Sequence, residues 1–161
     1  MNGNRVKLSM IGALMALMAA IPAMAEDSPP ELPTLEQLDK DTSMTAAFDA
    51  MTVNRTMPEW LKNGGVTTPT QQVGFDGKSW LAMSSCKPHD CASQRIAVIY
   101  EPKSNVMYGL LSETSNDGAE EKLSWLNMGG GAETIDGRTI LYAALTGSLQ
   151  NHPKGFDYNE N

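Results

Sequence analysis

The pattern of apolar residues over 71–112 limits this chain to folds that contain an antiparallel sheet. Apolar and polar residues alternate before and after the Asp-Gly pair at 76–77, which is a strong signal for a two-residue β-hairpin turn. Two more strand patterns follow, RIAVIY at 95–100 and VMYGLL at 106–111, and the short segment EPKSN joins them. The sequence therefore predicts a run of antiparallel strands connected in order.

Helical patterns lie on both sides of this run. Apolar residues recur at helical spacing after the N-cap candidates at 41–43, and again over 140–149 after Asp136. A short helix is predicted over 120–126, because two glutamates precede its apolar residues as acids do in a first helical turn. The triple glycine at 129–131 is interpreted as a flexible break. Helices before and after consecutive strands favour an α+β fold, with a central antiparallel sheet of about five strands flanked by helices.

The start of the chain is typical of a secretory signal peptide. Two basic residues precede an apolar run at 8–20, and PAMA at 22–25 supplies the small residues that signal peptidase reads. The run is shorter than the ~20 apolar residues of a membrane span. We therefore expect a signal peptide at 1–25, cleaved between Ala25 and Glu26, and export of the remainder.

The exported part is expected to form one domain. The polar, proline-rich segment EDSPPELP at 26–33 is predicted to be a disordered leader. The domain is expected over 34–158, which is long enough to bury a hydrophobic core, with a short tail at 159–161.

The exported part is also acidic. The signal peptide holds two of the twelve basic residues and none of the nineteen acidic ones, so the rest carries a formal charge of −9. This charge argues against nucleic acid or an anionic membrane as a partner and is compatible with a basic protein partner. Solubility alone would also explain it.

Both cysteines of the chain lie in one short segment, CKPHDC, from Cys86 to Cys91. Two cysteines in an exported protein predict a disulfide, and closing six residues removes roughly 2 kcal/mol of chain entropy. Pro88 fixes its own backbone, and Asp90 can accept a hydrogen bond from an imidazole N–H or a loop amide. We expect a stiff projection with His89 near its tip. It is either an ordinary stapled hairpin end or a preorganised finger that enters a cleft on another molecule.

The same residues do not form a convincing catalytic or metal site. A dithiol oxidoreductase has Cys-x-x-Cys at a helix N-terminus, whereas here four residues separate the cysteines between two strands. The candidate ligands in CKPHDC are too closely spaced to surround a zinc ion, and His152 is interpreted as a helix-end residue. A disulfide also removes the thiol that a Cys-His nucleophile needs. We expect no enzyme activity, no metal and no cofactor.

The CKPHDC run resembles the signature loop of the Ivy family, periplasmic inhibitors of vertebrate (c-type) lysozyme. The resemblance covers about 34–158, with matching segments in the same order: Ser93–Val98, Glu121–Leu123, Trp125–Asn127, Ala143–Leu149, Asn151–Pro153 and Gly155–Phe156. It implies a periplasmic, usually dimeric protein with a central antiparallel sheet flanked by helices.

The resemblance also implies a mechanism. The family's braced loop plugs the active-site cleft of c-type lysozyme, and the matching histidine, His89, lies between the two catalytic carboxylates. The inhibitory loop would comprise Cys86, Lys87, Pro88, His89, Asp90 and Cys91, with Lys87 and Asp90 making orienting and rim contacts. Because c-type lysozymes are strongly basic, an acidic inhibitor should encounter them faster. The alternative is a periplasmic regulator of the cell's own lytic transglycosylases, whose cleft also carries a catalytic acid.

Overall fold

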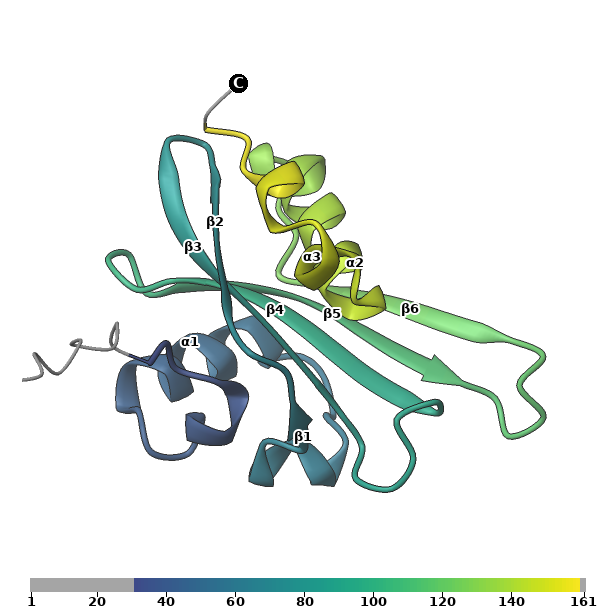
Figure 1. Ribbon diagram of the computed structural model, residues 1–161. Coiled ribbons are helices and arrows are strands. Elements are labelled where there is room, and N and C mark those ends of the chain that lie inside the picture. Colours follow the sequence, from purple (N-terminus) through teal and green to yellow (C-terminus); the bar gives the residue numbers. More distant parts are fainter. Residues whose placement is uncertain (1–30, 160–161) are drawn as a thin grey trace, which may run out of the picture. The chain divides into compact units, whose positions relative to one another are not determined.

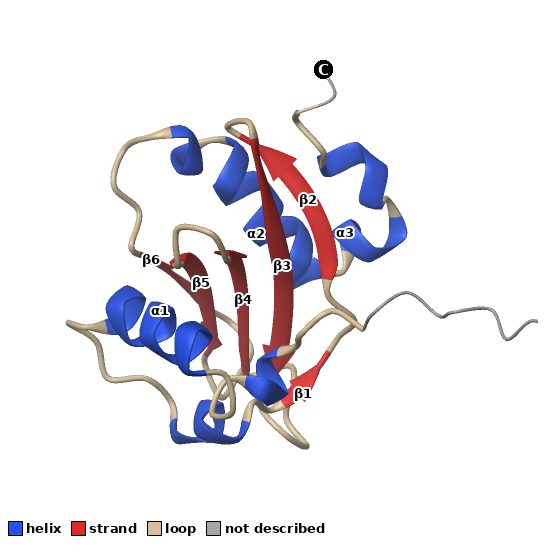
Figure 2. Cartoon of the chain, turned by 90° about the vertical axis from the view of Figure 1, so that its left-hand side faces the viewer, coloured by secondary structure: helices blue, strands red, loops and turns tan. Residues whose placement is uncertain are grey.

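A computed structural model describes residues 31–159. One antiparallel sheet carries helices on both faces (Figures 1 and 2), which confirms the predicted α+β fold. The elements in chain order are the 3-10 helix η1 (Leu35–Gln37), α1 (Thr42–Thr52), η2 (Glu59–Asn63), β1 (Val66–Thr67), β2 (Gln71–Phe75), β3 (Lys78–Cys86), β4 (Gln94–Glu101), β5 (Val106–Thr114), β6 (Glu121–Leu126), η3 (Ala132–Thr134), α2 (Asp136–Thr146), α3 (Ser148–Asn151) and η4 (Pro153–Phe156).

The expected signal peptide and the first residues of the leader, 26–30, lie outside the described residues. Between residues 31 and 159, no helix has both the length and the apolar character needed to cross a bilayer.

The sheet has six strands in the order β1-β3-β4-β5-β6, and β2 also pairs with β3. The long strand β3 therefore has two short partners along the same edge. Val73 of β2 lies opposite Trp80 of β3, and Val66 of β1 lies opposite Cys86 of β3. The predicted turn between β2 and β3 is confirmed, because Asp76 and Gly77 have φ values of 54° and 66°, as a type I′ turn requires.

The segment predicted to be a helix over 120–126 is instead strand β6. It pairs with β5 through six residues, from Thr114 opposite Glu121 to Gly109 opposite Leu126. The free edge of β5 offers a full ladder of backbone hydrogen bonds, which a helix of one or two turns cannot match. The two glutamates that suggested a first helical turn lie at the start of a strand.

Two hydrophobic clusters fill the space on the two faces of the sheet, and β4 contributes to both. Ile96 and Val98 pack in the cluster under α1, whereas Ala97 and Ile99 pack in the cluster under α2. All four side chains are fully buried, since successive residues of a strand point to opposite faces. The strand that follows the CKPHDC loop is therefore held between two packed layers.

Of the two helix N-caps predicted from the sequence, the first is confirmed and the second is displaced by one residue. Asp41 is the N-cap of α1, and its carboxylate accepts hydrogen bonds from the backbone N–H groups of Ser43 and Met44 at 2.9 and 3.0 Å. Asp136, expected to cap the last long helix, is instead the first residue of α2, and the N-cap is Ile135. A first-turn acid still has a favourable interaction with the helix dipole.

The triple glycine forms a hydrogen-bonded turn around a buried carboxylate, which the sequence did not predict. Glu133 is only 8% exposed. Its Oε1 accepts hydrogen bonds from the backbone N–H groups of Gly129, Gly130 and Gly131, at 3.0, 2.9 and 2.9 Å. The Gly131 hydrogen bond, supported by the other backbone bonds, lowers the pKa of Glu133, although burial opposes this shift.

We expect Glu133→Ala to lower the free energy of unfolding by about 2 kcal/mol at neutral pH, because three backbone donors lose a charged acceptor. Urea denaturation measures this loss, with Glu120→Ala on the exposed β5–β6 turn as the control. The stabilisation is complete above the ordinary pKa of a glutamate and disappears as the pH falls through the lowered pKa of the folded state. The difference between wild type and variant should therefore shrink in acid, and a difference that stays constant with pH would contradict this assignment.

Candidate functional site

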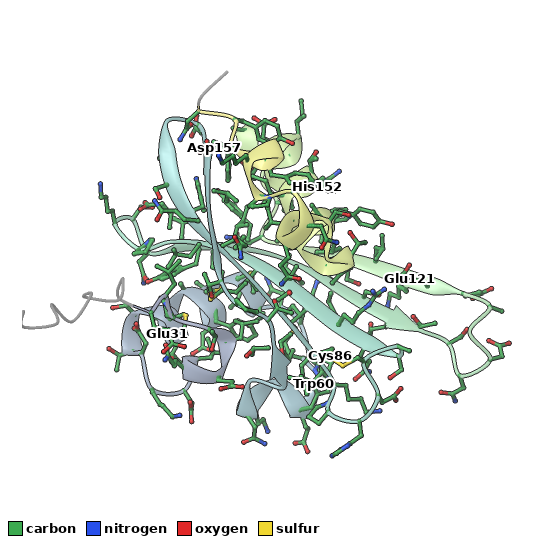
Figure 3. The ribbon with its side chains drawn as sticks, in the orientation of Figure 1. Glu31, Trp60, Cys86, Glu121, His152 and Asp157 are labelled. Carbon is green, nitrogen blue, oxygen red and sulfur yellow. A yellow bond between two sulfur atoms is a disulfide. The ribbon has the colours of Figure 1, made fainter. Side chains whose placement is uncertain are left out.

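The segment singled out in the sequence forms a closed loop between β3 and β4. The predicted disulfide joins Cys86 and Cys91, whose Cα atoms are 4.8 Å apart. Cys86 is the last residue of β3, and the next residue, Lys87, donates its backbone N–H to the carbonyl of Gln94 in β4 at 3.0 Å. Figure 3 shows the yellow disulfide beside Cys86, at the end of the sheet from which the loop projects.

The loop backbone turns sharply at its tip. Asp90 donates its backbone N–H to the carbonyl of Lys87 at 3.0 Å, which closes a turn with Pro88 and His89 in the middle. His89 has a φ of 63°, in the left-handed region that residues other than glycine seldom occupy. A proline followed by a left-handed residue is the arrangement of a type II turn. The Pro-His pair is the signal from which this turn could have been predicted.

His89 itself is exposed at this tip. Among residues 31–159, no hydrogen bond or ion pair to its imidazole is found. The side chain is therefore free to meet a partner with both ring nitrogens.

Asp90 does not bind the imidazole, which was one of the two options expected from the sequence. Its Oδ2 instead accepts hydrogen bonds from Ser93 Oγ at 2.6 Å and from Lys87 Nζ at 3.0 Å. The Ser93 bond is the main reason why the pKa of Asp90 is lowered, and the Lys87 bond adds to it. The carboxylate thus ties the two sides of the loop together through the residues that flank the tip.

We expect Ser93→Ala to raise the pKa of the Asp90 carboxyl toward its ordinary value, because the variant loses the hydrogen bond that contributes most to lowering this pKa. A carboxyl-carbon NMR titration measures this change. The control is Ser104→Ala, which removes a hydroxyl bonded to the carboxylate of Glu101 and not to the loop. An Asp90 titration that is the same in wild type and Ser93→Ala would show that this bond does not form in solution.

Contacts from distant segments hold the base of the loop. Trp60 in η2 donates its indole N–H to Gln94 Oε1 at 2.8 Å. On the other side of the stem, Arg95 Nη2 lies 2.9 Å from Glu121 Oε1 in β6, and the same oxygen accepts a 2.5 Å hydrogen bond from Ser112 Oγ. Figure 3 labels Trp60, Cys86 and Glu121 in this part of the molecule. Residues this far apart in sequence carry no local signal, and sequence reasoning missed their roles.

Other candidates do not join this loop. His152 follows α3, and Figure 3 shows it beside α2 and α3, away from Cys86. No cluster of three or more His, Cys, Asp or Glu residues suited to a metal ion occurs within the described part of the chain. Within the described residues, the candidate site is therefore a single loop with an exposed, unengaged imidazole at its tip.

The chain resembles proteins of one functional type. A family model described as "Inhibitor of vertebrate lysozyme (Ivy)" matches residues 43–125, which include the whole loop. A protein from Escherichia coli K12 named "Inhibitor of vertebrate lysozyme" is 46% identical over 148 residues, covering 92% of this chain and 91% of the relative. A protein of the same name from Pseudomonas aeruginosa is 29% identical over 121 residues, covering 74% and 76% of the two chains.

Proposed function

This chain belongs to the Ivy family of inhibitors of vertebrate lysozyme, and from this premise we propose that it inhibits c-type lysozyme by inserting the Cys86–Cys91 loop into the active-site cleft. The observation that carries the proposal is the position of His89, which is exposed and unengaged at the tip of a disulfide-closed turn. Because the family is one of protein inhibitors, the chain is not an enzyme.

The imidazole of His89 suits a cleft that holds two catalytic carboxyl groups. Lysozyme keeps one carboxyl protonated as the acid, while the other stays ionised. An imidazole between them can make a hydrogen bond to each, and a protonated ring donates from both nitrogens. The position that the ring occupies is then closed to the sugar, and the glycan is not cleaved.

The loop is suited to insertion because its shape is set before binding. The disulfide, the Lys87–Asp90 ion pair and the Ser93–Asp90 hydrogen bond all restrict it in the free protein. Ordering a loop costs binding free energy, and a loop that is already ordered avoids most of that cost. The restricted loop therefore favours the preorganised finger that enters a cleft, and not the alternative of an ordinary hairpin end.

Charge and export support the same partner. We propose that residues 1–25 direct the chain to the periplasm and are then removed, which leaves a formal charge of −9. Opposite charge on a basic lysozyme steers the two proteins together and raises the association rate. The rate should therefore fall as salt is added.

A lysis assay tests the function directly. Purified protein 26–161 is titrated into c-type lysozyme acting on bacterial cell walls, and we expect inhibition that saturates at a fixed molar ratio. Absence of inhibition at excess protein would overturn the proposal. Inhibition of a purified lytic transglycosylase, with none of lysozyme, would favour the alternative of a regulator of the cell's own wall enzymes.

A further inference from the structure

Five residues, one from each of five strands, form a row across the sheet at the base of the loop. The strand register places Val66 opposite Cys86, Cys86 opposite Arg95, Arg95 opposite Ser112 and Ser112 opposite Leu123. We call these five residues the basal row. Directly paired residues point to the same face of a sheet, so the basal row lies on one face.

The basal row lies on the face of the sheet against which α2 packs. Its position on that face is beyond the end of α2. Arg95 lies two residues before Ala97, which packs in the cluster under α2, so the two side chains share a face. The same conclusion follows from a pocket whose lining includes Val66, Cys86 and Arg95 together with Leu145 near the end of α2. In Figure 1 the β5–β6 hairpin continues past α2 and α3 toward the end of the sheet that carries the loop.

Both ends of the basal row are exposed and apolar. Val66 is 50% exposed and Leu123 is 37% exposed. In the middle of the row, the charge of Arg95 is matched by Glu121 at 2.9 Å. The basal row therefore presents an apolar side chain on each side of the disulfide and no unmatched charge between them.

The size of protein interfaces indicates why such a surface is needed. A stable interface buries about 800 Å² on each partner and involves some 20–30 residues a side. The loop from Cys86 to Cys91 supplies six residues. The basal row spans about 19 Å, from four strand spacings of about 4.8 Å, and continues directly from the loop through Cys86.

We propose that Val66 and Leu123 contact the same lysozyme that receives the loop, one on each side of the cleft. This inference rests on the proposed function and adds a second contact region to it. The loop supplies the group that enters the cleft, and the two apolar ends of the basal row fit against the rim around the opening. A contact of this kind excludes water around the inserted loop and slows dissociation.

The test is the double variant Val66→Ser/Leu123→Ser, assayed for inhibition of c-type lysozyme. We expect the inhibition constant to rise at least about tenfold, mainly through faster dissociation. The matched control is Val53→Ser/Ile135→Ser, which removes two apolar side chains that are each 75% exposed and lie outside the basal row. The control should change the inhibition constant less than about twofold.

Three results would overturn the inference. The first is equal potency of the row variant and the wild type, while His89→Ala loses inhibition; the proposed function would then stand without the second contact region. The second is a change in oligomeric state by sedimentation with unchanged potency, which would assign the row to contact between copies of this chain. The third is a wild type that does not inhibit, which would remove the proposed function as well. If the double variant does not fold, Leu123→Ser alone is assayed. Its inhibition constant is expected to be about threefold higher than that of Ile135→Ser.

Discussion

Replacing His89 with alanine is expected to weaken inhibition of lysozyme by about thirtyfold or more, which corresponds to about 2 kcal/mol of binding free energy. In the proposed complex the imidazole of His89 reaches both catalytic carboxyls. Removing it leaves those groups in a cleft from which the loop still excludes water, and unpaired polar groups in such a place are costly. The inhibition constant, measured by titrating lysozyme activity, reports the loss.

The fold should survive this change, because His89 is exposed and has no partner in the described part of the chain. The control is His152→Ala, which removes the other histidine of the chain, also exposed and located after α3. We expect the His152→Ala variant to have the same inhibition constant as the wild type. Equal potency of the His89 and His152 variants would contradict the proposed role of His89, and unchanged circular dichroism would show that both had folded.

The second large effect is expected from opening the disulfide. In Cys86→Ser/Cys91→Ser the loop loses the bond that closes it, which costs roughly 2 kcal/mol of stability on the loop-closure estimate. Binding must then also order a loop that was previously held, at a cost of about 1 kcal/mol for each backbone unit that is newly fixed. We expect the inhibition constant to rise at least about tenfold.

A reduced wild type provides an independent measurement of the same effect. No free cysteine occurs among the described residues, and the chain has only two cysteines in all, so a reductant acts on this bond alone. Reduced and alkylated protein should have a higher inhibition constant than oxidised protein. The inhibition constant of the serine variant should not change with reductant. Full potency of the serine variant would show that hydrogen bonds around Asp90 are enough to shape the loop.

Much of the fold could be predicted because its signals are local. The Asp-Gly turn at 76–77 and the apolar patterns of β4 and β5 depend on neighbouring residues, and the structure confirms them. The segment at 120–126 was assigned wrongly for the same reason. Its acidic start is a local helix signal, whereas the pairing of β6 with β5 is a non-local interaction that outweighs it.

The candidate site was predictable to a similar extent. The disulfide and the exposed tip follow from two cysteines, a proline and their spacing. The left-handed backbone of His89 was missed, although the Pro-His pair gives a local indication of it. The bonds from Trp60 to Gln94 and from Arg95 to Glu121 span 34 and 26 positions. They depend on how the strands are ordered in the sheet, which no short segment encodes.

The left-handed conformation of His89 also bears on how this protein can change over evolutionary time. Glycine is the residue that adopts such a backbone at no steric cost, so replacement by glycine would relax the turn. It would also abolish the imidazole on which the proposed inhibition depends. At position 89 the backbone conformation therefore favours glycine, whereas the proposed inhibition requires the imidazole of histidine, so stability and inhibition make opposite demands on this residue.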